Sequence, residues 1–259
     1  MNNSLEDLAI RKLRDEVKLQ CEFAIMGHQD IEQTWQALFN NMQASKQAND
    51  DFLRARKELH ETYQMHLDDP QKRDDYYRER RRALESVNQV TEPLQKNIQP
   101  QKKRLFYAVQ SFLVAVANVG KLFWPTRPQE ETPRREKLRK ALLIENDMNK
   151  HDFGKNVRKV RNSFEHFDAR IDGEWFNSTG SHNMADLNIM PLSMIEGIKP
   201  TNCFRNFDPN DFSITFYDDK IELSSSSPLM VSLQELLRNI EEIERQELTD
   251  IHPNITASN

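Results

Sequence analysis

Apolar residues recur at intervals of three and four over the N-terminal part of the chain. Because an α-helix places such residues on one face, this spacing predicts a helix from Leu5 to Ser45. Gly27 and the three polar residues after it predict a break or kink, at which Asp30 can cap a second helical segment. The apolar positions of this segment are Leu5, Leu8, Leu13, Val17, Cys21, Ala24, Ile31, Trp35 and Leu38.

Residues 47–97 are strongly charged and carry few apolar side chains, so we expect a long helical arm inserted into the rest of the chain. Asp69 and Pro70 stop the helical pattern near its middle, which predicts two helices. The arginines of the arm, at positions 78, 80, 81 and 82, are interpreted as a solvated cluster. Its sparse apolar positions are Phe52, Leu59, Tyr63, Leu67, Tyr77, Leu84 and Val87.

The segment from Leu105 to Phe123 has the broadest apolar face of the chain, and it predicts a core helix that ends before Pro125. A short basic helix is expected over 134–143. Gly154 is a plausible hinge before the next helix, over 156–171. Five apolar residues of that helix alternate at +3 and +4 and predict a buried seam. They are Val157, Val160, Phe164, Phe167 and Ile171.

The pattern changes after Gly173. Residues 177–209 indicate a long, partly ordered loop. Alternation over 212–223 predicts a β-hairpin in which Phe216 pairs with Ile221 and Ile214 with Leu223, around a two-residue turn at 218–219. A last helix is expected to start with Ser232 as its cap and Glu235 completing the capping box. The sequence therefore predicts a mainly α protein, with a helical bundle over 1–173 and a C-terminal region over 174–259.

Composition narrows the class of protein. The chain has 259 residues, a net charge of −5, two cysteines and six glycines, which disfavours glycine-rich phosphate-binding folds and a disulfide framework. Its start is charged throughout, and the 105–124 segment carries too many polar residues for a membrane span. We expect a cytoplasmic protein that does not contact membranes. The scattered histidines show no ligand spacing, so neither a metal nor a cofactor is expected.

Positive charge gathers between Arg134 and Arg161, where ten Lys and Arg side chains stand against four carboxylates. A locally basic surface of this kind attracts phosphate even on an acidic protein, although a solvated helix face explains it equally well.

The helix over 156–171 carries the residues with the clearest chemical potential. With Val157 at zero and a step of ~100° per residue, Arg161 falls near ~40° and Glu165 near ~80°. Asn162 falls near ~140° and His166 near ~180°. If two copies of this helix pack across a symmetry axis, two arginines and two histidines share one cleft. An arginine that holds a phosphodiester and a histidine that moves a proton suffice for metal-independent RNA cleavage.

The string Arg161-Asn-Ser-Phe-Glu-His-Phe-Asp168 resembles the R-x(4–6)-H motif of the HEPN superfamily, in which a polar residue often follows the arginine. The upstream string Ser111-Phe-Leu-Val-Ala-Val-Ala-Asn-Val-Gly-Lys-Leu-Phe-Trp-Pro125 is also similar to a set of bacterial HEPN-like proteins. The resemblance covers roughly 5–40 and 105–171 and does not extend to the arm.

This resemblance implies a HEPN-like helical bundle that dimerises through the motif helix, commonly with endoribonuclease activity in toxin, stress or antiviral roles. It implies catalytic roles for Arg161, Asn162 and His166, with RNA as substrate. Asp168 stands where one toxin branch has a tyrosine that accepts AMP, so such a modification is not expected here.

Arg158, Glu165 and Asp168 are possible supporting residues, although Glu165 and Asp168 fit ordinary ion pairs with Arg158 or Arg161 one turn away better than an acid–base pair. Two alternatives to the enzyme stay open. One is a non-catalytic HEPN-fold binding or assembly module. The other is an accessory subunit of a larger complex that docks a protein partner through the 47–97 arm.

Overall fold

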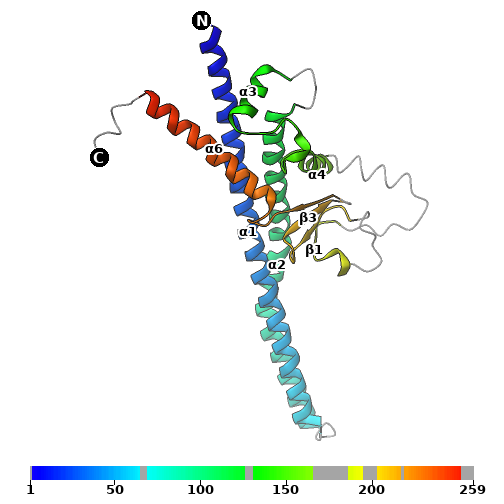
Figure 1. The fold of residues 1–259 in the computed structure, drawn as a ribbon. Helices are drawn as coiled ribbons and strands as arrows, with labels where there is room; N and C mark the ends of the chain where they lie inside the picture. Colours follow the sequence, from blue (N-terminus) through cyan, green and yellow to red (C-terminus); the bar gives the residue numbers. More distant parts are fainter. Residues whose placement is uncertain are drawn as a thin grey trace, which may run out of the picture. The chain divides into compact units, whose positions relative to one another are not determined.

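The computed structural model describes residues 2–64, 69–125, 131–165, 186–194, 203–216 and 219–251 (Figure 1). The chain forms two compact units. One unit contains residues 1–29 and 107–259, and the other contains residues 30–106. The described residues are mainly helical, as the sequence predicts, with one small sheet near the C-terminus. The predicted boundary at residue 173 lies outside the described residues and stays a prediction.

The first helix, α1, runs from Asn2 to Tyr63 without interruption, so the predicted break after Gly27 is wrong. Gly27 instead allows close packing between two helices. A Cβ atom at this position would lie 3.2 Å from the Cα atom of Phe112 on α2, which is tighter than ordinary van der Waals contact. A glycine inside a helix therefore marks a close approach here, which a local breaker signal does not distinguish from a kink.

The second helix, α2, runs from Pro70 to Phe123, so the chain divides near Asp69 and Pro70 as predicted. The predicted core face is confirmed, because Val109, Phe112 and Val116 are fully buried. One 18-residue window of α2 is apolar and long enough to cross a membrane, but 61% of it is buried inside the protein. A buried core helix has these same properties.

The unit of residues 30–106 is an antiparallel helical hairpin made of parts of α1 and α2. The inward-facing residues of α1 recur at steps of three and four, as in a coiled coil. They are Ile31, Thr34, Leu38, Asn41, Ser45, Ala48, Phe52, Ala55, Leu59 and Tyr63. Asn41 donates a hydrogen bond of 2.8 Å to Gln101 across the hairpin, which favours one register of the two helices.

Near the end of the hairpin the inward residues of α2 differ from the predicted apolar positions. Tyr76 is buried and contacts the ring of Tyr63 at a centroid distance of 5.9 Å. Tyr77 and Leu84, which the sequence pattern placed on the apolar face, are 55% and 44% exposed. Two adjacent tyrosines fit a helical pattern in either phase, and packing against α1 selects Tyr76.

Shorter helical elements belong to the other unit. The short helix α3 spans Pro133–Ala141, close to its predicted range. It is followed by the 3₁₀ turn η3 (Met148–Lys150) and by α4 (Lys155–Glu165). A second 3₁₀ turn, η4, spans Leu192–Met194.

The strands form one four-stranded sheet in the order β1-β2-β3-β4. They span Asn188–Ile189 (β1), Asn206–Asp208 (β2), Ser213–Phe216 (β3) and Asp219–Glu222 (β4). The predicted hairpin is therefore half of a larger sheet, and β1 and β2 lie in a stretch that was expected to be a loop. Strands of two and three residues are too short to show alternation in a sequence.

The predicted register of the hairpin is wrong by two residues. Ile214 lies opposite Ile221, and Phe216 lies opposite Asp219. The backbone N–H of Leu223 donates to the carbonyl of Phe212 at 2.7 Å, which continues the same register. Because the shift is an even number of residues, the apolar side chains remain on the predicted core face.

The last helix, α6, spans Pro228–Ile251 and begins earlier than predicted. Ser227, rather than Ser232, caps it, because the Ser227 hydroxyl accepts the backbone N–H of Met230. Pro228 occupies the first helical position, where its missing N–H costs nothing.

Polar contacts join α6 and the sheet to α1. Arg14 forms a two-bond ion pair with Glu247, at 2.8 and 2.9 Å, and Lys18 pairs with Glu244 at 2.6 Å. The buried His28 ring lies within 2.6 Å of the Leu223 carbonyl oxygen, where the hairpin leaves the sheet. The C-terminal elements thus pack on the N-terminal helix within one unit.

Candidate functional site

Helix α4 carries the predicted motif. Gly154 precedes its first residue and accepts the backbone N–H of Arg158. Val157 and Val160 are buried, as the predicted seam requires, and α4 packs on β3 and β4 of the same chain. The described part of the seam therefore covers the protein's own sheet. The seam residues Phe164, Phe167 and Ile171 lie outside the described side chains.

Arg161 and Asn162 lie together on α4 away from the buried valines. The Arg161 side chain is half-buried, Asn162 is exposed, and Arg161 Nη1 donates a hydrogen bond of 2.9 Å to Asn162 Oδ1. An asparagine that accepts from a neighbouring guanidinium holds it in one orientation. The pair therefore supplies an oriented cation at the surface of α4.

The other members of the predicted site are only partly described. Glu165 is the last described residue of α4, and its side chain is outside the described part. His166 and Asp168 also lie outside the described residues. The arrangement of Arg161 relative to His166 therefore stays a prediction.

Arg158, a possible supporting residue, contacts the end of α2. Its Nη2 atom donates to the backbone carbonyls of Gly120, at 2.6 Å, and Trp124. Burial, and secondarily the charge of Arg135, lowers the pKa of the Arg158 guanidinium. This geometry gives Arg158 the role of satisfying carbonyls that the helix end leaves unbonded.

Two more arginines from the basic segment bind the same helix end. Arg135 Nη1 donates to the carbonyls of Lys121, at 2.6 Å, and Leu122, at 2.8 Å. Arg139 is buried and donates from Nη1 to the Phe123 carbonyl. We call Arg135, Arg139 and Arg158 the arginine cap. Cations at the C-terminal end of a helix also interact favourably with its dipole. The arginine cap therefore stabilises the end of α2 both by hydrogen bonds to its carbonyls and by its positive charge.

Three lysines of the basic segment are paired with carboxylates. Lys140 lies 2.9 Å from Glu136, Lys150 lies 2.6 Å from Glu145, and Lys159 lies 2.6 Å from Asp219. Together with the arginine cap, these pairs engage six of the ten cations that the sequence concentrates between 134 and 161. Most of the local positive charge is thus paired with carbonyls or carboxylates of the same chain, although the three lysine pairs lie at the surface.

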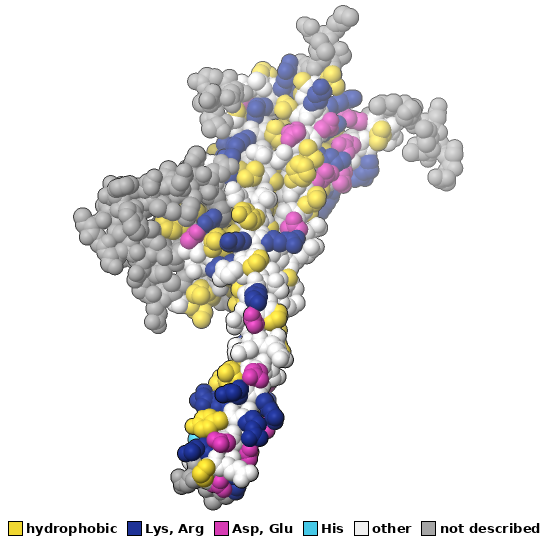
Figure 2. Space-filling view, turned by 180° about the vertical axis from the view of Figure 1, so that it is seen from behind, with side chains coloured by type: hydrophobic (Ala, Val, Ile, Leu, Met, Phe, Trp, Pro, Cys, Tyr) yellow, Lys and Arg dark blue, Asp and Glu magenta, His cyan; other side chains and the backbone are white. Residues whose placement is uncertain are grey.

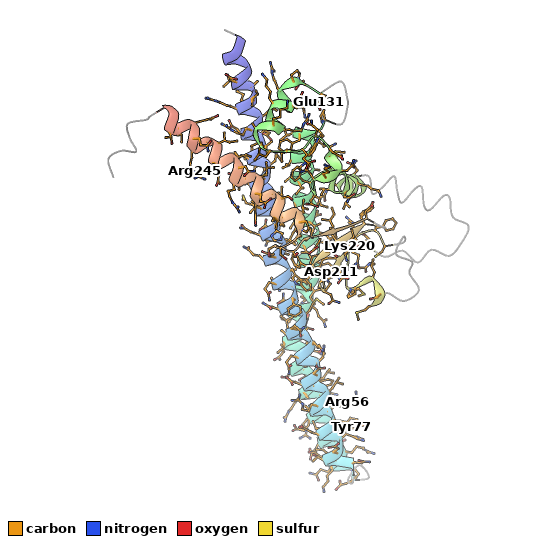
Figure 3. All side chains as sticks on the ribbon, in the orientation of Figure 1. Arg56, Tyr77, Glu131, Asp211, Lys220 and Arg245 are labelled. Atoms are coloured by element: carbon orange, nitrogen blue, oxygen red, sulfur yellow. The ribbon has the colours of Figure 1, made fainter. Side chains whose placement is uncertain are left out.

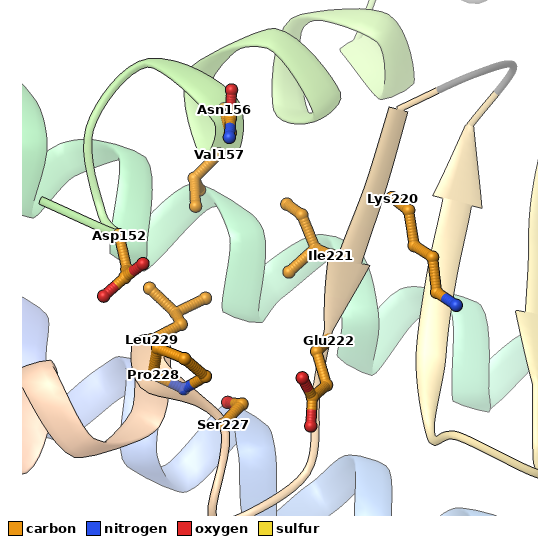
Figure 4. Close-up of a pocket in the computed structure, with 9 residues that line it drawn as sticks. All are labelled: Asp152, Asn156, Val157, Lys220, Ile221, Glu222, Ser227, Pro228 and Leu229. Atoms are coloured by element: carbon orange, nitrogen blue, oxygen red, sulfur yellow. The ribbon is translucent and has the colours of Figure 1, made fainter. Parts of the chain in front are cut away.

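A pocket of about 210 Å³ lies at the other end of α4, between its first turn, β4 and the start of α6 (Figure 4). Val157, Ile221 and Leu229 converge on it, with Asp152 and Glu222 at its edge. Asp152 accepts from Ser232 at 3.1 Å, and Glu222 accepts from Ser224 at 2.7 Å. Both carboxylates therefore have partners, and the residues that line the pocket do not include Arg161 or Asn162.

Other reactive groups of the described chain are buried or dispersed. No group of three or more His, Cys, Asp and Glu side chains among the described residues is placed to hold a metal ion. Cys21 is fully buried, and this burial raises the pKa of its thiol to about 12, so the thiolate is absent at neutral pH.

The comparisons with known proteins identify no relative. No family model, no curated protein and no solved structure matches the chain.

Sequence reasoning placed Arg161 and Asn162 on a helix and missed the arginine cap. The cap joins residues that are between 13 and 38 positions apart, so no local spacing predicts these contacts. Its one available signal was the position of a basic segment directly after a long apolar helix, whose end needs donors.

Proposed function

We propose that the chain is a HEPN-like, metal-independent endoribonuclease that acts as a dimer through the Arg161-x4-His166 helix. In the proposed reaction His166 removes the proton from an RNA 2′-hydroxyl. The 2′-oxygen then attacks the adjacent phosphorus, and the bond to the 5′-oxygen breaks. The products are a 2′,3′-cyclic phosphate and a 5′-hydroxyl, with the leaving oxygen protonated by the partner's His166.

One observation carries this proposal: the two arginines on α4 have different hydrogen-bond partners. Arg158 donates to backbone carbonyls at the end of α2, whereas Arg161 donates from Nη1 to the exposed Asn162 on α4 itself, and both arginine side chains are half-buried. An arginine oriented in this way suits bidentate binding of a phosphodiester and stabilises the charge that develops on it. Asn162 then acts as the positioning residue for Arg161.

The test is cleavage of a mixture of single-stranded and structured RNAs by the full chain in excess chelator. Wild-type protein is expected to produce 2′,3′-cyclic phosphate ends. His166→Ala is expected to lower the rate by about 100-fold or more through loss of general acid–base catalysis. Arg161→Ala is expected to lower it by a similar factor, because it removes a donor that stabilises the charge developing on the phosphate. Asn162→Ala should lower it less.

Arg134→Ala is the matched control, because Arg134 is an exposed arginine of the same basic segment. Its activity should equal that of the wild type. Circular dichroism of each variant checks the fold, and light scattering checks the dimer. RNA left intact by a folded dimer would refute the enzyme and favour the non-catalytic binding module. Activity that disappears equally in Arg134→Ala would also refute the assigned roles.

A further inference from the structure

The two sides of the helical hairpin formed by residues 30–106 carry different charges. We measure each angle about the helix axis from the direction that faces the other helix, which we call the inward direction. With steps of ~100° per residue, Arg56 lies ~55° and Leu53 ~115° from the inward direction of α1 near the end of the hairpin. Tyr77 lies ~90° and Leu84 ~70° from the inward direction of α2, turned in the same sense. In an antiparallel pair, equal rotations on the two helices bring these residues to the same side.

We call this side the arginine flank. Its members are Leu53, Arg56, Arg73, Tyr77, Arg80, Arg81 and Leu84. The ring contacts of Tyr76 with His60, at 6.5 Å, and with Tyr63, at 5.9 Å, fix the register that places the two halves of the flank at one level. Figure 3 labels Arg56 and Tyr77 at neighbouring heights along the hairpin, and Figure 2 shows Lys and Arg mixed with hydrophobic and acidic side chains over its end.

Several carboxylates of this region lie on the outward face of the hairpin, namely Asp50, Glu61, Asp74 and Glu85, and Asp74 and Glu85 border the arginine flank. Four others lie on the side opposite the flank, namely Asp51, Glu58, Asp75 and Glu79. Three of them pair with neighbouring arginines: Arg54 with Asp51, Arg78 with Asp75, and Arg82 with Glu79. Within the described residues, Arg56, Arg80 and Arg81 form no ion pair or side-chain hydrogen bond and are exposed. The arginine flank therefore presents positive charge without a local partner.

The same flank exposes large apolar side chains. Leu53 is 57% exposed, and Tyr77 and Leu84 on the facing helix are 55% and 44% exposed. A helix in a two-helix coiled coil needs an apolar seam only toward its partner. Apolar residues beside this seam widen the apolar face of the helix, and such a wider face is typical of helices that contact a third helix. An aliphatic–aromatic–aliphatic set surrounded by arginines thus fits an apolar helix seam bordered by acidic residues.

We propose that the arginine flank docks an acidic amphipathic α-helix of a partner protein, which would complete a three-helix bundle at the end of the hairpin. A second copy of the hairpin is a poor occupant, because it would bring a second set of unpaired arginines against the first. The acidic helix α6 of a second copy is also disfavoured, since Glu244 and Glu247 already bind Lys18 and Arg14. Such a partner gives the arm a role that does not depend on the ribonuclease proposal.

The test uses the full chain and a fluorescein-labelled peptide about three heptads long, with leucine at both seam positions and glutamate beside the seam. A control peptide carries lysine in place of each glutamate. Fluorescence anisotropy is expected to show that the acidic peptide binds and the basic peptide does not. Failure of the acidic peptide to bind at about 100 µM, or equal binding of both peptides, overturns the proposal.

Matched variants locate the binding surface. Leu84→Gln is expected to weaken peptide binding by about tenfold, because it removes one apolar contact. Val90→Gln changes a comparably exposed apolar residue on the other side of α2 and should alter affinity less than about twofold. A similar effect of both substitutions would contradict the assigned flank.

A second pair of variants separates local charge from net charge. Arg80→Glu with Arg81→Glu should weaken peptide binding by about tenfold or more. Arg54→Glu with Arg82→Glu makes the same change in net charge on the opposite side and should leave binding nearly unchanged. An oligouridine probe tests whether the flank binds the negative charge of RNA instead of an acidic helix. RNA binding that disappears in the Arg80/Arg81 variant, combined with no peptide binding, would identify a nucleic-acid surface and reject the helix partner.

Discussion

Replacing Arg139 with alanine is the most direct test of the arginine cap. The Arg139 side chain is 6% exposed and donates to the Phe123 carbonyl, to Asn146 Oδ1 at 3.0 Å and to Glu131 at 2.9 Å. The Glu131 side chain is 41% exposed, so water can replace that bond in the variant. The two remaining acceptors lose a charged donor, at about 1.5–3 kcal/mol each before relaxation. We therefore expect Arg139→Ala to lower the free energy of unfolding by about 3–4 kcal/mol.

Urea unfolding followed by Trp fluorescence measures this loss. Trp124 lies beside the cap, and its Nε1 donates to the Asn146 carbonyl, so its fluorescence reports on the affected region. Arg139→Lys keeps the positive charge but places it on a single ammonium group. It should lower the free energy of unfolding by about half as much as Arg139→Ala. Lys140→Ala is the matched control, because its exposed pair with Glu136 contributes less than about 1 kcal/mol. A loss below about 1 kcal/mol for Arg139→Ala would refute the idea that the cap stabilises the end of α2.

Two further predictions concern stability. Glu247→Gln should lower the free energy of unfolding by about 1–2 kcal/mol at pH 7, through loss of the bond to the buried Arg14. The bond to Arg14 lowers the pKa of Glu247, so this contribution is present above the unfolded carboxyl pKa and disappears as pH falls through the folded pKa. Urea titrations of both proteins from pH 7 to pH 3 should therefore converge, and a constant difference would contradict the ion pair. Gly120→Ala should destabilise by about 1–3 kcal/mol, because its Cβ atom would lie 2.6 Å from the Phe153 carbonyl oxygen. Gly27→Ala, with 3.2 Å to Phe112, should destabilise less, and thermal unfolding of the two variants measures the difference.

The helices were predictable where their apolar faces pack inside the chain. The face of α2 around Val109 and Phe112 follows directly from its spacing, because burial of a broad apolar stripe leaves little choice of orientation. Helix ends were less predictable. Ser232 with Glu235 matches a capping box, yet Ser227 with Pro228 begins α6 one turn earlier. Both start signals are local in the sequence, so the choice of Ser227 as the first cap depends on contacts of the preceding hairpin.

The sheet shows a different limit. Alternation at Ile214 and Ile221 identified the core face of the hairpin, because a strand has a side-chain period of two. The same alternation is unchanged by a shift of two residues, so it does not fix the register. Lys159 contributes to that choice through its ion pair with Asp219, and this contact joins residues 60 positions apart. Tertiary contacts of this kind are absent from any local pattern.

At the candidate site, sequence and structure agree on placement and differ on the use of charge. Arg161 and Asn162 lie on a helix as predicted, and Val157 and Val160 are buried beneath them. The sequence interpretation made Arg158 a possible supporting residue of the site or an ion-pair partner of Glu165 or Asp168. An arginine side chain is long enough to reach the backbone of a neighbouring element, so its position on a wheel does not decide what it binds.

Charge counted along the sequence therefore differs from charge that a ligand meets. The basic segment from Arg134 to Arg161 is the most positive part of the sequence, but six of its ten cations bind carbonyls or carboxylates of the protein. The arm has many acids and looks nearly neutral in the sequence, but Arg80 and Arg81 are exposed and form no ion pair among the described residues. Unpaired exposed charges attract ligands in a manner that salt screens. Binding at the arginine flank should consequently weaken steeply between about 50 and 300 mM salt, whereas the stability conferred by the arginine cap, whose members are buried or half-buried, should change less over the same range.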